Sequence, residues 1–198
     1  MRRLLSQQNK KLGRIPSFSI PTTTCNKSMV KAQGCDKYCY ARRLERLRPV
    51  MVAKYKWNFV QSKRATFVND MCQELKYVGD VVRVHSSGDF YSQTYLNKWL
   101  TIARFNPHKT FFTYTKRIEL DFSERPNNFK VILSDDKELF KNKVIIRLSK
   151  FPFHLYDGKA RVKKKPKEEK GWIICPGFCE DCRVCWERKN PLITFKLK

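Results

Sequence analysis

The segment VVRVHSSGD, residues 81–89, changes from mostly apolar to polar residues, and this change indicates the fold class. Its first four residues are mostly apolar and predict a buried strand, Val81–Val84, which gives way at once to polar residues and a glycine. A helix is predicted next, from Gln93 to Arg104, and its inward face consists of Leu96, Trp99, Leu100 and Ala103. A buried strand, a polar loop and an amphipathic helix in succession are typical of an α/β fold.

Other apolar runs repeat this pattern. They predict strands at Ile15–Ile20, Thr110–Tyr114, Phe129–Leu133 and Val144–Leu148. Polar residues follow the last three of these strands, as expected of parallel strands whose carboxyl ends line a site. A complete eight-stranded barrel takes about 250 residues, whereas this chain has 198. We therefore expect an α/β fold of the partial or reduced TIM-like (β/α) barrel type.

Residues 41–77 have a helical pattern, and Pro49 predicts a break between two helices. One face of the second helix is apolar and consists of Val68, Met71, Cys72 and Leu75. Cys72 is therefore interpreted as a buried core thiol and not as a metal ligand.

Two regions are expected. Residues 1–160 form a barrel-like α/β domain that includes an N-terminal cysteine loop, and residues 161–198 form a basic linker and a cysteine-rich segment packed on that domain. The charge run RVKKKPKEEK, residues 161–170, has no apolar periodicity and predicts an exposed loop that either contacts nucleic acid or is simply solvated. The apolar alternation of Leu192–Leu197 predicts an edge strand.

Charge and targeting signals indicate the kind of partner and compartment. The chain has 42 lysines and arginines against 18 acidic residues, a formal net charge of +24. Such a charge favours polyanions and predicts nucleic acid as a partner, although it also serves solubility. The first sixteen residues lack the apolar stretch of a signal peptide, and no run reaches membrane-spanning length. We expect a cytoplasmic protein with no membrane partner, in which clustered thiols bind metal more often than they form disulfides.

The first cysteine group, Cys25, Cys35 and Cys39, has the spacing C-x9-C-x3-C. Three thiolates suit a [4Fe-4S] cluster with one iron left open for a substrate or cofactor. Zinc with a fourth ligand from elsewhere is the competing interpretation. Cys39 is placed just before a predicted helix start, where the helix dipole favours thiolate. His85 lies at a strand end, but a lone histidine is more often a hydrogen-bonded structural residue.

The second group has four cysteines within eleven residues, spaced C-x3-C-x2-C-x2-C: Cys175, Cys179, Cys182 and Cys185. Four such thiolates hold one metal centre, or three hold one while the fourth completes the N-terminal site. Zinc is an alternative here too, although four-cysteine zinc sites usually consist of two separated pairs.

Four stretches of the chain together resemble a known family. They are CNKSMVKAQGCDKYCYA (25–41), VVRVHSSGDFYSQTYLNKWL (81–100), TFFTYTK (110–116) and the ending CPGFCEDCRVCW (175–186). They resemble a bacteriophage and plasmid family labelled gene product eighty-eight, over about residues 15–187, and more loosely the radical-SAM-like phage proteins with a CYA motif. The resemblance implies a viral iron–sulfur protein of the host cell cytoplasm on a barrel-like scaffold, with Cys25, Cys35 and Cys39 as cluster ligands.

Radical SAM enzymes as a class have C-x3-C-x2-C and a GGEP-like run, and this chain has neither. Radical SAM enzymes bind S-adenosylmethionine at the ends of their strands. The candidate binding residues at comparable strand ends of this chain are Ser87, Gly88, Asp89 and Tyr114. Asp89 and Lys116 are the candidate catalytic residues. An ordinary turn is the other interpretation of Gly88-Asp89, for which this pair of residues is well suited.

Three functional hypotheses follow from these residues. They are a radical-SAM-like iron–sulfur enzyme acting on or near nucleic acid, an iron–sulfur electron-transfer or redox-sensing protein, and a zinc-stabilised nucleic-acid-binding module. The aromatic residues beside the proposed site either stack on bases or pack as core and loop anchors: Tyr38, Tyr40, Phe90 and Tyr91.

Overall fold

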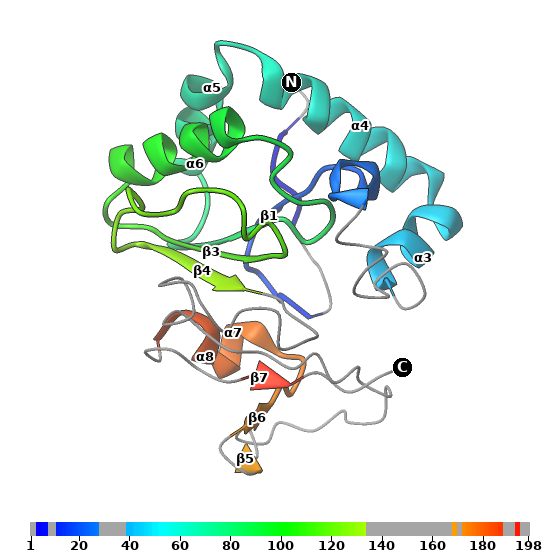
Figure 1. Cartoon of the computed structure of the whole chain (residues 1–198), viewed down its shortest axis with the longest axis vertical. Helices are drawn as coiled ribbons and strands as arrows, with labels where there is room; N and C mark the ends of the chain where they lie inside the picture. Colours follow the sequence, from blue (N-terminus) through cyan, green and yellow to red (C-terminus); the bar gives the residue numbers. More distant parts are fainter. Residues whose placement is uncertain are drawn as a thin grey trace.

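The main element of the structure is an open sheet of four parallel strands (Figure 1). The computed structural model describes residues 3–7, 11–27, 39–133, 168–169, 172–187 and 193–194. Its strands β1 (Ser17–Phe18), β2 (Val81–Val84), β3 (Thr110–Thr115) and β4 (Phe129–Leu133) lie side by side in the order of the sequence. The predicted α/β class and parallel sheet are confirmed. The described strands do not close a barrel, and the predicted strand Val144–Leu148 lies outside the described residues.

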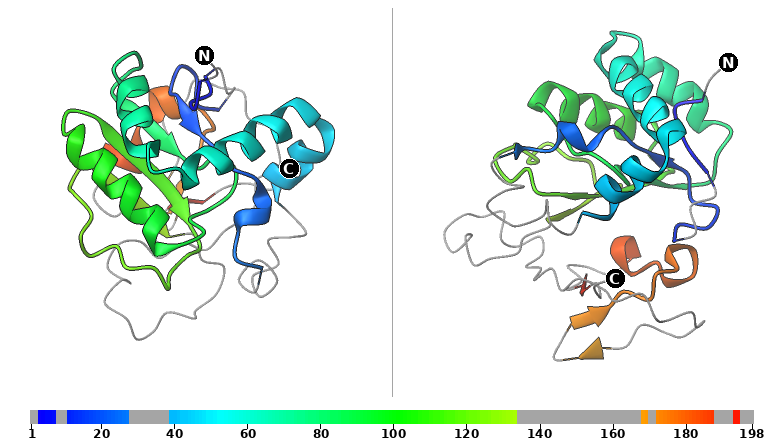
Figure 2. Two further views of the ribbon diagram at one scale, coloured as in Figure 1. Left: turned by 90° about the horizontal axis from the view of Figure 1, so that it is seen from above. Right: turned by 90° about the vertical axis from the view of Figure 1, so that its right-hand side faces the viewer.

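Helices cover one face of this sheet. The 3-10 helix η1 (Thr22–Thr24) and the helices α3 (Tyr40–Leu47), α4 (Pro49–Lys63) and α5 (Phe67–Leu75) connect β1 to β2, and α6 (Gln93–Phe105) connects β2 to β3. Figures 1 and 2 show α4, α5 and α6 on the same side of the strands. The connection from β3 to β4 contains no helix, as expected from its short length.

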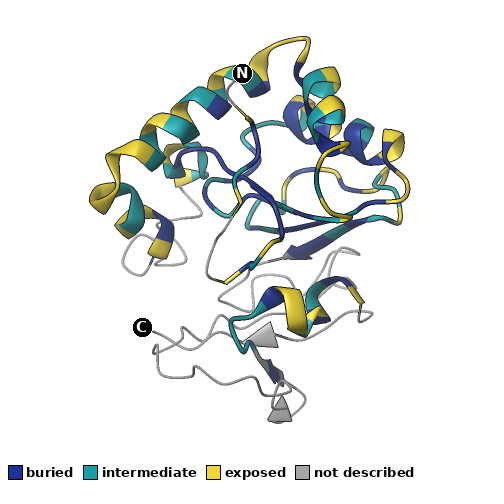
Figure 3. Cartoon of the chain, turned by 180° about the vertical axis from the view of Figure 1, so that it is seen from behind, coloured by how far each residue is buried: buried dark blue, intermediate teal, exposed yellow. Residues whose placement is uncertain are grey.

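The main core lies between the sheet and α5 and α6, where buried residues line the inner sides of the helices (Figure 3). Alternation along β3 sends Phe111 into this core and Phe112 to the opposite face. Phe18 of β1 packs edge to face on Trp99 of α6, with ring centroids 5.3 Å apart. The inward face predicted for α6 is confirmed, because its four residues are all buried.

The helical region contains three helices, and the prediction of two was wrong. The break at Pro49 is confirmed, because this proline is the first residue of α4. The missed break lies between α4 and α5. There the Lys98 ammonium, from α6, donates hydrogen bonds to the carbonyls of Ser62, Lys63 and Arg64 at 2.8 to 3.2 Å. These carbonyls at the end of α4 have no partner within their own helix, so a distant side chain stabilises the helix end.

Cys72 packs against the main core, as expected. It is partly buried beside the fully buried Met71 and Leu75 of α5. The side-chain amide of Asn106 donates a hydrogen bond to its sulfur at 3.3 Å. The thiol therefore belongs to the packing of α5.

The C-terminal segment lies against the sheet face opposite α4 to α6 (Figure 1). It contains α7 (Cys179–Cys182), α8 (Val184–Glu187) and a small sheet of β5 (Glu168–Glu169), β6 (Trp172–Ile174) and β7 (Ile193–Thr194). The rings of Trp186 in α8 and Phe112 in β3 lie 4.6 Å apart. The predicted edge strand is confirmed in part, because Ile193–Thr194 form β7, which pairs with β6 at the edge of this small sheet. Residues 192 and 195–197 lie outside the described residues.

One expectation for the charge run was wrong. Glu168 and Glu169, predicted to lie in an exposed loop, form β5 and pair antiparallel with β6. Backbone hydrogen bonds form this pairing and need no apolar side chain, so periodicity could not reveal it. No described helix has the length and apolar character needed to span a membrane.

Candidate functional site

The carboxyl ends of β1, β2 and β3 meet at one edge of the sheet. The chain segments that leave these strands are Thr22–Thr24, His85–Asp89 and Thr115–Arg117. Parallel pairing fixes this meeting, because Phe18 lies opposite Val84 and Val84 lies opposite Thr113. The predicted gathering of polar strand ends at one edge is therefore seen for β2 and β3, and the segment after β1 joins them. Ser134-Asp135-Asp136 and Ser149-Lys150 lie outside the described residues.

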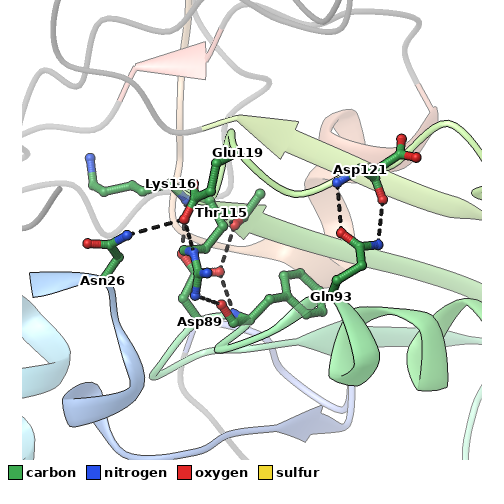
Figure 4. Close-up of polar contacts among 9 residues, drawn as sticks. Asn26, Asp89, Gln93, Thr115, Lys116, Glu119 and Asp121 are labelled. Atoms are coloured by element: carbon green, nitrogen blue, oxygen red, sulfur yellow. Dashed lines mark hydrogen bonds and ion pairs between the residues drawn. The ribbon is translucent and has the colours of Figure 1, made fainter. Parts of the chain in front are cut away.

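Asp89 accepts several of the hydrogen bonds that connect the segments at this edge (Figure 4). Its side chain is buried, and one carboxylate oxygen accepts hydrogen bonds from the Thr115 hydroxyl at 2.7 Å and the Phe90 backbone N–H at 2.8 Å. The other oxygen accepts from the backbone N–H of Lys116 at 2.9 Å. Burial raises the pKa of Asp89 to about 6, although these hydrogen bonds and Arg117 oppose the rise. The carboxylate thus joins the end of β2 to the end of β3.

The free energy of unfolding should depend on the protonation of Asp89. Its pKa is about 6 in the folded chain against an ordinary value of 3.8, so the unfolded chain loses this proton first as pH rises. The protonated group therefore favours the folded state at low pH. This contribution, on the order of 3 kcal/mol, is lost between about pH 4 and pH 6.

Urea denaturation of the wild type and of Asp89→Asn measures this effect. The unfolding free energy of the wild type minus that of the variant should fall by the same amount over this pH interval, because asparagine does not titrate. A difference that stays constant with pH would contradict the raised pKa.

Glu45 joins helix α3 to the same edge. One of its carboxylate oxygens accepts hydrogen bonds from the backbone N–H of Thr22 and the hydroxyl of Ser87, both at 2.9 Å. The other accepts from the Thr22 hydroxyl at 2.6 Å. Glu45 was not among the predicted site residues. A signal was present, because Glu45 is the only acidic residue between Cys39 and Arg64.

His85 is a structural residue, as predicted. Its imidazole is buried, and Nε2 lies 2.9 Å from the hydroxyl of Tyr95 in α6. Burial and the charge of Arg83 lower the pKa of His85 to about 3, so the ring is neutral at physiological pH.

The first cysteine group reaches this edge through Cys25 and Cys39, while Cys35 lies outside the described residues. Cys39 immediately precedes α3, as predicted, and its sulfur accepts a hydrogen bond from the backbone N–H of Arg42 at 3.4 Å. Burial raises the pKa of the Cys25 thiol to about 12, and the charges of Asp89, Cys39 and Glu45 add to the rise. A bound cation would reverse this effect, because it favours thiolate.

The second cysteine group lies on the sheet face below β3. Cys175 follows β6, Cys179 and Cys182 begin and end α7, and Cys185 belongs to α8. The backbone N–H of Cys179 donates to the carbonyl of Lys11 at 2.8 Å. No disulfide joins the seven described cysteines.

Cationic and phenolic groups border these thiols. Burial raises the pKa of Cys179, while the nearby charges of Lys11 and Arg83 lower it. The Arg83 guanidinium lies 4.1 Å from the ring centroid of Tyr114, and the Tyr114 hydroxyl lies 2.7 Å from the sulfur of Cys185. Positive charge beside four thiols suits a centre that is negative once its ligands are thiolates.

The described side chains include no group of three or more histidines, cysteines or acids already arranged around a metal position. The cysteine side chains themselves are suitable ligands for an iron–sulfur cluster. Four sulfurs lie on one short segment beside two cations, and a second pair lies beside two carboxylates. Metal binding by either group stays a prediction.

The structure separates the residues predicted to bind S-adenosylmethionine. Ser87, Gly88 and Asp89 lie together at the end of β2, and Lys116 joins them through its backbone N–H. Tyr114 instead points to the opposite face, where it contacts Cys185. Neighbouring residues of a strand alternate between faces, so Thr115 and not Tyr114 reaches Asp89.

Comparison with known proteins gives the family. The sequence profile described as "Gene product 88" matches residues 2–188. The chain belongs to this family. Two similar relatives are the "Gene 88 protein" of Mycobacterium phage L5, 28% identical over 123 residues, and that of Mycobacterium phage D29, 26% identical over 123 residues.

Each of these alignments covers 49% of this chain, and 52% or 51% of the relative. The chain therefore spans about half the length of these relatives. The comparisons confirm the gene product 88 resemblance and give no evidence of a relationship to radical SAM enzymes. No solved structure matches this member of the gene product 88 family.

Proposed function

We propose that this protein binds an iron–sulfur cluster through Cys175, Cys179, Cys182 and Cys185. The observation that carries the proposal is the position of these four thiols, on one short segment against the sheet and beside Lys11 and Arg83. A [4Fe-4S] cluster with four thiolates carries a net negative charge, which these cations offset. The Tyr114 hydroxyl beside Cys185 supplies a hydrogen bond to a ligand sulfur, an interaction known to tune cluster potentials.

In the same proposal Cys25, Cys35 and Cys39 hold a second [4Fe-4S] cluster with one open iron at the sheet edge. The support is the proximity of Cys25 and Cys39 to Asp89 at the carboxyl ends of the strands, where α/β proteins commonly bind ligands. The sequential order of the four described parallel strands is compatible with a reduced barrel.

A radical-SAM-like reaction on or near nucleic acid is the enzymatic form of this proposal. Asp89 already accepts three hydrogen bonds from the protein. We therefore assign it to positioning the edge, and Lys116 is the remaining candidate for contact with a substrate or cofactor. Ser87 and Gly88 would border S-adenosylmethionine.

Electron transfer or redox sensing is the second candidate function. The observation that favours it is the burial of Cys179 and the partial burial of the other three C-terminal thiols beside two cations. Such a site needs no open coordination position and no contact with Asp89 or Lys116.

The visible spectrum of anaerobically purified protein tests these alternatives. A brown protein whose absorption bleaches on reduction supports an iron–sulfur protein. A spectral change on adding S-adenosylmethionine supports the enzymatic form, and indifference to it supports electron transfer or sensing. A colourless protein would contradict both and leave a zinc-stabilised nucleic-acid-binding module.

A further inference from the structure

Helix α3 and the turn into α4 present four exposed arginines to solvent. We call this set the arginine face: Arg42, Arg43, Arg46 and Arg48. Figure 3 shows that exposed residues follow the outer sides of α3 and α4. Among the described residues, Arg42, Arg43 and Arg46 make no ion pair and no side-chain hydrogen bond, so their charges are available to a partner.

The local charge is not balanced on this face. Between Cys39 and Arg64 the sequence has seven basic residues and a single acid, Glu45. That acid is turned inward, where its carboxylate accepts hydrogen bonds from Thr22 and Ser87. The outer side of α3 is therefore purely cationic, and its complement is a polyanion.

An aromatic ring stands at the beginning of the same helix. Tyr40 is 62% exposed, yet its hydroxyl donates a hydrogen bond to the backbone carbonyl of Ser86 at 2.6 Å. One end of the side chain is thus held at the sheet edge. A base that stacks on an already positioned ring costs little side-chain entropy.

We propose that the arginine face and Tyr40 together bind single-stranded nucleic acid. The guanidinium groups contact backbone phosphates, and the Tyr40 ring stacks on one base. A strand bound in this way passes beside Cys39 and Ser86 at the edge of the sheet. The inference deepens the nucleic-acid part of the proposed function and does not depend on a bound cluster.

A nucleic acid fits this surface better than an anionic lipid membrane. The exposed apolar residues at this end are Leu47 and Val50, which flank the turn between α3 and α4. Helix α3 has eight residues and is about 12 Å long, too short for the continuous apolar stripe of a membrane-surface helix. Arginine suits phosphate recognition because its planar guanidinium donates paired hydrogen bonds.

Fluorescence anisotropy with a labelled oligo-dT of about 20 nucleotides tests the proposal, since single-strand sites span roughly 4–16 nucleotides. The full chain is titrated over a range of salt concentrations. Arg43→Gln/Arg46→Gln should reduce the slope of log K against log salt by about 1.4, because each lost phosphate contact contributes about 0.7. Tyr40→Ala should weaken binding at least about five-fold, the loss expected for one stacked base.

Two controls match these variants. Lys76→Gln/Arg104→Gln removes the same charge from two exposed positions, one just after α5 and one in the last turn of α6, and should leave the slope nearly unchanged. Tyr40→Phe keeps the ring and should retain most of the affinity. Circular dichroism of every variant establishes that the fold is intact.

The outcomes distinguish binding at the arginine face from nucleic-acid binding elsewhere on the protein. If the wild type binds and both double variants behave alike, nucleic-acid binding holds but the arginine face is not its site. If the wild type does not bind the oligonucleotide, both proposals of nucleic-acid binding fail. Binding to phosphatidylserine vesicles in place of the oligonucleotide, lost in Arg43→Gln/Arg46→Gln, would overturn the proposal in favour of a membrane partner.

Discussion

Replacing Gly88 with alanine is expected to lower the free energy of unfolding by about 3 kcal/mol. Gly88 has φ +76°, a backbone conformation that non-glycine residues adopt at a cost of roughly 1–2 kcal/mol. A Cβ atom there would also lie 2.6 Å from Cγ1 of Ile20 and 2.7 Å from the Ile20 carbonyl oxygen. One of these atoms belongs to the backbone, so the clash cannot be relieved by a side-chain rotation.

Two other glycines provide matched controls for this prediction. Gly177 also has a positive φ, but nothing lies within 4 Å of its Cβ position. Alanine there should therefore lower the free energy of unfolding only by the backbone cost of roughly 1–2 kcal/mol. Gly79 has the same open surroundings and no positive φ, so alanine there should be close to neutral. Urea denaturation should rank the three variants in this order. Equal midpoints for Gly88→Ala and Gly79→Ala would show that the segments following β1 and β2 are not in close contact at Gly88.

Removing two thiols from α7 should abolish one cluster. The double variant Cys179→Ser/Cys182→Ser is expected to lose about four iron atoms and as much acid-labile sulfide per chain, because a [4Fe-4S] cluster needs its thiolate ligands. Cys25→Ser/Cys39→Ser should separately remove the cluster proposed at the sheet edge. Iron and sulfide analysis after anaerobic purification measures both losses.

Cys72→Ser is the control for these variants, because Cys72 lies in the packing of α5 and belongs to neither cysteine group. It should retain the full iron content of the wild type. Unchanged iron in the α7 variant would contradict the ligand assignment. Loss of all iron in both double variants would indicate one shared centre, an alternative that the spacing of the cysteines left open.

The sequence predicted those strands and helices whose bounds depend only on their own residues. The bounds of β2 and β4 match their apolar runs, and α6 buries the face that its periodicity indicated. The end of α4 could not be predicted, because the Lys98 ammonium that stabilises it comes from another helix. The pairing of β5 was hidden for a similar reason, since its two glutamates pair through the backbone.

The sequence predicted which chain segments form the candidate site. It did not predict the hydrogen bonds that join these segments. Asp89 at a strand end was found because polar residues follow an apolar run. Its partner Thr115 was not found, since the choice between Thr115 and Tyr114 depends on which face of β3 each side chain takes. Glu45 was missed because a lone acid in a basic helix looks like a solvent-exposed residue until the ends of β1 and β2 are placed beside it.

Whether this protein binds iron–sulfur clusters is decided by the content of iron, acid-labile sulfide and zinc in anaerobically purified wild-type protein. We expect about eight iron atoms per chain, about four for each of the two proposed clusters, with an equal amount of sulfide and no stoichiometric zinc. Stoichiometric zinc without sulfide, or a protein free of metal, would contradict this expectation.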